Sequence, residues 1–137
     1  VAKNQWLKVA SIPSIRFNHT SCVYRGESAE INQYLIYNIG GKVDFSNYAT
    51  TIDIYNHNYS SDENFVWTAV RVDTLKVEKL ASLQVNPFGL LIFGGVNQHD
   101  KQKSKTCFFL DPNDDNSITE LDEQLQEPAE FVNGCQI

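Results

Sequence analysis

The side chains that could bind a metal ion are scattered along this chain of 137 residues. Its three histidines, His19, His57 and His99, have no second ligand two or four positions further along and no Cys-x-x-Cys pair nearby. Zinc and copper sites are built from several ligands that converge on the ion. The spacing therefore predicts no metal site and no bound cofactor.

Groups for acid–base or nucleophilic catalysis are not paired either. Six carboxylates could serve as acids or bases, namely Asp44, Asp53, Asp62, Glu63, Asp100 and Asp111. No serine occupies a G-x-S-x-G elbow, and no two carboxylates are placed by spacing for acid–base work. We therefore expect this chain not to be an enzyme.

Two glycine pairs, Gly40-Gly41 and Gly94-Gly95, could be taken for phosphate-binding loops. Neither has the Lys-Ser/Thr pair of a Walker loop or the G-x-G-x-x-G spacing before a helix. Glycine is also the residue used where the backbone bends with a positive φ and neighbouring atoms crowd in. We expect all four glycines to be structural.

Each glycine pair closes a short, largely apolar run, 34–39 or 88–93, and a polar loop and a second β-rich run follow it. The pairs lie 54 residues apart, and the tryptophans Trp6 and Trp67 lie 61 apart. Self-similarity at such a period indicates a repeat architecture. The chain is therefore expected to hold about two copies of one structural unit.

The order of apolar strand, Gly-Gly, loop, aromatic strand and Trp strand resembles the kelch repeat, whose period is about 50 residues. The first copy carries five further features of that pattern: Pro13, Arg16, His19, Tyr55 and Trp67. The second is degenerate, because Leu110 and Ile118 stand where Tyr55 and Trp67 would be. The resemblance implies an all-β fold of kelch-type β-propeller blades, each a four-stranded antiparallel sheet.

In this interpretation residues 1–10 are the last strand of a preceding blade and 11–72 the first full blade. Residues 73–125 form the second blade, and 126–137 begin a following one. A propeller needs typically 4–8 blades, so the propeller is incomplete within this chain. The chain also starts with Val and contains no Met, which indicates an excerpt or a processed product.

Alternation of side chains and turn residues predicts the individual strands. The expected strands are 6–10, 18–24, 34–39, 50–56, 65–72, 80–85, 88–93, 106–111 and 118–121. Residues 122–125 are expected to form at most one helical turn, and 127–133 resemble the approach to another innermost strand. Aromatic residues of these strands, including Trp6 and Trp67, are expected to fill the space between blades.

The net charge of −6 is unevenly distributed. All 11 lysines and arginines lie within residues 1–105 together with nine acidic residues, and the other eight acidic residues lie within 106–137. Binding nucleic acid would require neutralising phosphates, so we expect no nucleic-acid partner. No apolar run approaches the length of a membrane span, so we expect no membrane partner.

The three cysteines, Cys22, Cys107 and Cys135, are odd in number and lack metal-ligand spacing. They indicate reduced thiols in a cytoplasmic protein. Two glycosylation sequons, at Asn18 and Asn58, leave secretion as the minority alternative.

Polar loops on a rigid β scaffold are where binding usually resides. In kelch propellers the loop after the glycine pair and the link between blades commonly hold partners. Together these considerations predict five binding residues: Arg16, Lys42, Asp44, Asn97 and His99. The expected function is a protein–protein interaction module, an adaptor or scaffold. Kelch proteins include ubiquitin-ligase adaptors and cytoskeletal scaffolds, and these residues do not choose between them.

Two alternatives stay open at this point. One is a propeller-based enzyme, an oxidase or a glycosidase, although the three arginines Arg16, Arg25 and Arg71 supply no matching cluster. The other is a structural subunit of a large assembly, in which exposed edge strands pair with another chain. A full-length sequence would separate them, through adaptor domains on one side or a secretory signal with catalytic ligands on the other.

Overall fold

The computed structural model describes residues 4, 6, 10–26, 33–58, 66–85 and 87–130. These residues form two four-stranded antiparallel sheets and one two-stranded sheet, which confirms the all-β fold class. The first sheet contains β1 (Thr20–Tyr24), β2 (Gln33–Ile39), β3 (Thr51–Asn58) and β4 (Val66–Arg71) in that order. The second contains β6 (Ala81–Val85), β7 (Gly89–Phe93), β9 (Ser104–Asp111) and β10 (Ser117–Ala129). β5 (Val77–Glu78) and β8 (Val96–Asn97) pair with each other.

The described residues contain no helix. Accordingly, this part of the chain offers no helix long and apolar enough to cross a membrane.

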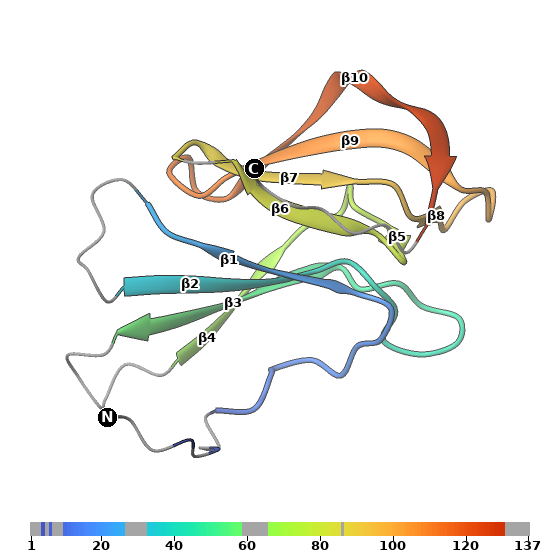
Figure 1. Ribbon diagram of the computed structural model, residues 1–137. Coiled ribbons are helices and arrows are strands. Elements are labelled where there is room, and N and C mark those ends of the chain that lie inside the picture. The colour runs from blue at the N-terminus through green and yellow to red at the C-terminus, as the bar shows by residue number, and fades with distance from the viewer. Residues whose placement is uncertain are drawn as a thin grey trace.

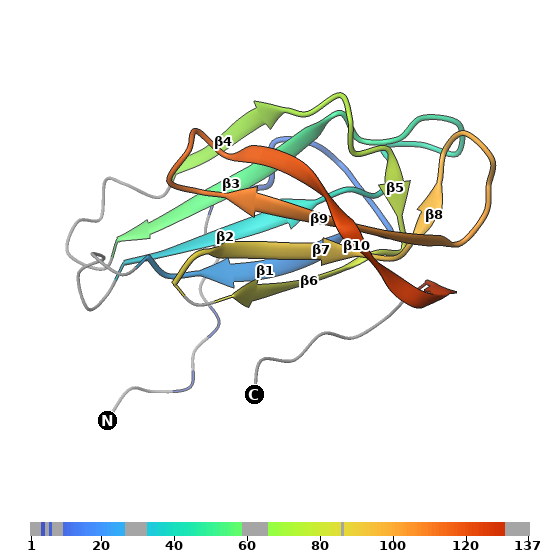
Figure 2. The ribbon, with the colours of Figure 1, turned by 90° about the horizontal axis from the view of Figure 1, so that it is seen from above.

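The two large sheets face each other, close together along one side and further apart along the other (Figures 1 and 2). They lie closest at β1 and β6, where Thr20 Oγ1 and Ser82 Oγ are 3.0 Å apart. Away from this line the sheets separate towards β4 and β10 (Figure 1). The space between them is filled by a buried apolar cluster: Tyr24, Tyr37, Ile39, Ile52, Ile54, Leu75, Val77, Leu80, Leu90, Ile92 and Leu110.

The second sheet repeats the first in its register. Tyr55 on β3 lies opposite Trp67 on β4, and Leu110 on β9 lies opposite Ile118 on β10. The backbone before the first strand of each unit also repeats. Phe17 forms a β-bridge with Lys42, the residue after the first glycine pair, and Glu78 pairs with Val96, the residue after the second. The chain therefore contains two structurally equivalent units.

Positive φ angles recur at matching positions in the two units. Asn18 and Lys79, each just before its unit's first strand, have φ of 56° and 57°. The glycine pairs have φ of 69° and 85° in the first unit and 70° and 91° in the second. The left-handed region is open to glycine at little cost, so both units use glycine for the same bend.

Close neighbours also require glycine at the second position of each pair. A Cβ atom at Gly41 would lie 2.5 Å from the Phe17 carbonyl oxygen. One at Gly95 would lie 2.6 Å from the Glu78 carbonyl oxygen. Both contacts fall on the segment that enters the first strand of the unit, so each glycine lets the loop pack directly on that segment.

The strand predictions for the glycine-bearing runs and their neighbours match the structure to within a few residues. The C-terminal part differs, because β10 is continuous through 122–125, where at most one helical turn was expected. Its register against β9 shifts after Glu120 and again after Gln124, which indicates bulges that extend the strand. Of residues 127–133, those from 131 onward lie outside the described residues.

The predicted N-terminal strand, residues 6–10, does not appear among the described residues. Of residues 6–10, the structure describes Trp6 and Ala10, and neither belongs to a strand. The side chain of Trp6 is fully exposed, so the expectation that it packs between sheets is wrong for this structure. Trp67, by contrast, is half-buried and donates a hydrogen bond from Nε1 to the Ala10 carbonyl oxygen at 3.0 Å.

Candidate functional site

Arg16 was expected on a binding surface, and the structure places it inside the protein. Its side chain and that of Asp53 are both fully buried, and they form an ion pair with Nη2 and Oδ2 2.9 Å apart. Nη1 donates to the carbonyl oxygens of Gly40 at 3.2 Å and Thr51 at 3.0 Å. Nη2 also donates to Ser14 Oγ at 2.8 Å.

This arrangement gives Arg16 a structural part in the first unit and keeps its side chain away from the surface. Burial lowers the pKa of the guanidinium, and the Asp53 carboxylate opposes that shift. An arginine stays charged in proteins, so its charge needs the carboxylate and the carbonyl oxygens around it. A partner could reach Arg16 only by displacing the segment that carries it.

The loops that follow the two glycine pairs meet at one end of the molecule, together with the link between the sheets. We call this region the loop end and define it as residues 42–48, 76–79 and 97–103. Glu78 lies at its centre and is buried. Its carboxylate accepts hydrogen bonds from Asn18 Nδ2 at 2.8 Å and from the Tyr48 hydroxyl at 3.2 Å. Glu78 therefore ties the link to the first unit.

Tyr48 joins the two loops. The ammonium group of Lys42 lies 5.3 Å from the centre of its ring, and that of Lys101 lies 5.0 Å from it. Cations over an aromatic face are attracted by the ring quadrupole. Burial and then the nearby Glu78 carboxylate raise the pKa of Tyr48 to about 12, so it remains a hydrogen-bond donor at neutral pH.

Residues 42–48 form a small hairpin that is ordered by its own hydrogen bonds. Asp44 accepts from the backbone N–H of Ser46 and of Asn47, each at 2.8 Å, and from Asn47 Nδ2 at 2.8 Å. These bonds, that from the Asn47 side chain first, lower the pKa of Asp44. Asp44 thus holds the shape of the hairpin.

The hairpin carries exposed apolar side chains. Phe45 is 93% exposed, although it stands in a loop whose other residues are largely polar. Its ring lies 6.3 Å from that of Phe17, and Val43 and Phe17 are each 38% exposed. Three apolar side chains are therefore presented together on a backbone that is already ordered.

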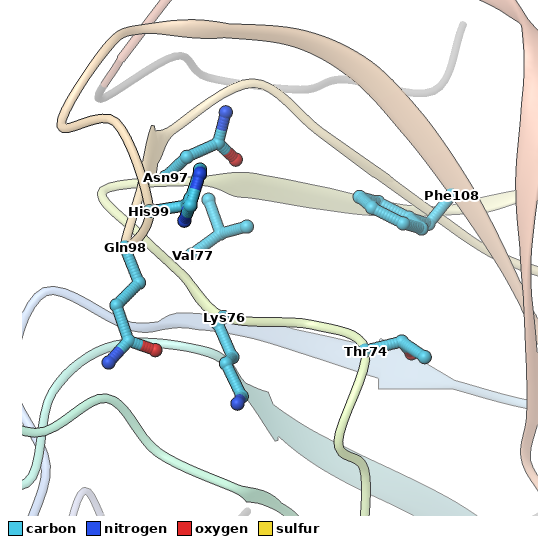
Figure 3. Close-up of a pocket in the computed structure, with 7 residues that line it drawn as sticks. All are labelled: Thr74, Lys76, Val77, Asn97, Gln98, His99 and Phe108. Carbon is cyan, nitrogen blue, oxygen red and sulfur yellow. The ribbon is translucent and has the colours of Figure 1, made fainter.

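Asn97 and His99 line a pocket of about 530 Å³. Its other described lining residues are Thr74, Lys76, Val77, Gln98 and Phe108. Figure 3 shows Phe108 on one side and the loop residues Asn97, Gln98 and His99 on the other. The backbone N–H of Gln98 donates to the Lys76 carbonyl oxygen at 3.0 Å, which fixes the loop against the link.

The charges of the loop end are only partly neutralised. Lys79 and Lys103 share Glu130, at 3.6 and 3.5 Å. For Lys76 and Lys101, no described carboxylate lies within ion-pair distance. The loop end therefore combines exposed aromatic surface with ammonium groups that a partner can reach.

The part of the chain that the structure describes shows no cluster of metal-binding side chains and no activated thiol. No three His, Cys, Asp or Glu side chains gather there in a way that could hold a metal ion. Cys22 and Cys107 are free thiols whose pKa is raised by burial, while Cys135 lies outside the described residues. A buried thiol with a raised pKa is a poor nucleophile.

Four of the five predicted binding residues, Lys42, Asp44, Asn97 and His99, lie at the loop end, and Arg16 does not. Reasoning from sequence missed Phe45, Tyr48 and Glu78. For Phe45 a signal was present, because a phenylalanine within a polar loop has no strand to pack into. For Glu78 there was none, since its role depends on contacts between units far apart in sequence.

No protein-family model matches this chain, and no curated protein is similar to it.

Proposed function

We propose that this chain is a protein–protein interaction module in which the two units are kelch-type β-propeller blades and the loop end binds a protein partner. The resemblance of the glycine, tyrosine and tryptophan pattern supports the blade assignment. So do the shared register and the matching positive φ angles of the two units. A scaffold of this kind carries function on its loops.

The observation that carries the proposal is the exposure of Phe45 on an ordered hairpin. Aromatic residues, phenylalanine among them, are enriched in the buried cores of protein interfaces. An anchor held in place before binding loses little conformational entropy when the partner arrives. Asp44 supplies that order through three hydrogen bonds. Phe45 is 93% exposed, and its ring makes a tilted contact with that of Phe17.

Peptide display on the full chain tests this proposal. Random peptides are selected on the immobilised protein, and the affinity of each enriched peptide is measured by fluorescence anisotropy. We expect Phe45→Ser to weaken binding at least about tenfold, which corresponds to about 1.4 kcal/mol. The loss follows from removing the anchor without touching a buried residue.

Phe88→Ser is the matched control. Phe88 is 65% exposed and lies in the turn between β6 and β7, so the same chemical change is made away from the loop end. Its affinity should stay within about twofold of the wild type. If no peptide is enriched, or if both variants lose affinity equally, the loop end is not the binding surface.

A further inference from the structure

The pocket at the loop end occupies the place that an ion pair fills in the first unit. Arg16 and Val77 are equivalent positions in the two units. Arg16 directly precedes Phe17 and Val77 directly precedes Glu78, and these two residues pair with the residue after each glycine pair. Asp53 and Phe108 are also equivalent, because each lies opposite the residue two before its glycine pair. Val77 and Phe108 both line the pocket.

The exchange of residues explains why a pocket exists here. In the first unit the long side chain of Arg16 reaches Asp53 and fills the space with a guanidinium group. In the second unit the short side chain of Val77 cannot reach across, and Phe108 presents a ring where the carboxylate stood. The result is a pocket with an apolar floor of Val77 and Phe108.

The rim of this pocket is polar and carries no negative charge among its described residues. It consists of Thr74, Lys76, Asn97, Gln98 and His99. All five are exposed or half-buried, so they can turn towards a ligand. In Figure 3 the side chains of Lys76 and Gln98 extend in the same direction, away from the side chains of Val77 and Phe108.

We propose that this pocket receives an apolar side chain of an acidic peptide segment, whose neighbouring carboxylates bind Lys76 and the amides of the rim. This inference rests on the proposed function, because it names the chemistry of the partner. The floor removes apolar surface of the guest from water. The ammonium group of Lys76, which has no described carboxylate within ion-pair distance, supplies charge-assisted hydrogen bonds to carboxylates.

A peptide fits better than a nucleic acid. The chain carries a net charge of −6, which opposes a polyanion over any extended contact. The loop end places its free positive charge in a small area next to apolar surface. A short segment that alternates carboxylates with an apolar residue matches both features at once.

Fluorescence anisotropy with defined probes tests the pocket on the full chain. One probe is a labelled peptide with a leucine between pairs of glutamates, and the other has glutamine in place of every glutamate. We expect the acidic probe to bind at least tenfold more tightly than the glutamine probe. Its affinity should fall as salt is raised, because exposed charges are screened.

Two variants locate the binding. Lys76→Glu reverses the charge of an exposed rim residue, and Thr74→Phe fills the pocket from an exposed position. Each should weaken the acidic probe at least tenfold. Lys105→Glu makes the same charge change on β9, where Lys105 bonds the Gln126 carbonyl oxygen, and should leave binding within threefold. Thermal unfolding checks that each variant is folded, and Lys76→Glu, on the surface, carries the test if Thr74→Phe is not.

Several outcomes would overturn the pocket. These are absence of binding by the acidic probe, equal binding of both probes, or unchanged affinity in Lys76→Glu. Equal or tighter binding of a thymidine oligonucleotide of the same charge would also overturn it. If Phe45→Ser abolishes binding of the displayed peptides while Lys76→Glu and Thr74→Phe do not, the interaction module stands and the acidic-peptide pocket fails.

Discussion

The two units of this protein share one backbone conformation but carry different side chains at two equivalent positions. In the first, Arg16 and Asp53 form a buried ion pair that also satisfies backbone carbonyl oxygens. In the second, Val77 and Phe108 occupy the same positions, and a pocket remains. The frame is fixed by glycine pairs with positive φ and by strand register, whereas the side chains between its strands are free to differ. The same pair of positions therefore holds a buried ion pair in one unit and lines a pocket in the other.

The largest effect is expected from breaking the ion pair of the first unit. Arg16→Met leaves the Asp53 carboxylate buried without its partner, which typically costs about 3–5 kcal/mol of unfolding free energy. Urea unfolding followed by circular dichroism measures the loss. Arg71→Met is the control, because the Arg71–Asp73 pair is exposed and such pairs contribute about 0–1 kcal/mol.

A double variant tests the equivalence of the two units directly. Arg16→Val with Asp53→Phe installs the residues of the second unit in the first. Replacing a buried ion pair by apolar residues is often neutral, so this variant should be more stable than Arg16→Met. If it is instead less stable than Arg16→Met, the two pairs of positions are not interchangeable and the equivalence of the units fails.

The glycine pairs should give equal effects in the two units. Gly41→Ala and Gly95→Ala each force a side chain into the left-handed region and against a carbonyl oxygen. Each is expected to cost at least about 1–3 kcal/mol. Gly26→Ala is the control, since a Cβ there would meet Tyr24 at an ordinary 3.5 Å. A cost at only one of the two glycines would show that the units bend differently.

A smaller, pH-dependent difference separates His19 from its equivalent Leu80. Burial first, and then the Arg16 charge, lower the pKa of His19 from its ordinary 6.5, while Asp53 opposes them. Below pH 6.5 the unfolded chain therefore binds a proton that the folded chain resists, so stability falls as pH drops from 7 to 5. His19→Leu should flatten this part of the stability profile in urea unfolding at several pH values. An unchanged slope would mean that another group titrates.

The strands and glycine turns of the fold could be predicted from the sequence, but the side-chain packing between the strands could not. Glycine pairs, apolar runs and the Tyr55–Trp67 spacing gave the strands, because they depend on local conformation and alternation. The burial of Arg16 depends on Asp53 and on carbonyl oxygens of two strands, which no local pattern reveals. The pocket arises from Val77 and Phe108, whose equivalence to that pair becomes visible only through strand register.

The smallest expected effect is a local change in amide hydrogen exchange in the hairpin at 42–48, for which the loop at 97–103 supplies the control. The lowered pKa of Asp44 means that its ionised form is favoured in the folded chain. Its hydrogen bonds are therefore complete above the ordinary value of 3.8 and are lost as the pH falls below it. Asp44→Ala should speed amide hydrogen exchange at Ser46 and Asn47 and leave the global unfolding midpoint unchanged.

Asp100 provides the control for that measurement, because it accepts a single backbone bond, from the N–H of Gln102 at 2.9 Å. Asp100→Ala should leave exchange at Ser46 and Asn47 unaltered. If Asp44→Ala also leaves it unaltered, the hairpin is ordered by other contacts, such as the bond from the Val43 N–H to the Asn47 carbonyl oxygen. Faster exchange together with weaker peptide binding in Asp44→Ala would show that the affinity conferred by Phe45 depends on the hairpin being ordered before a partner arrives.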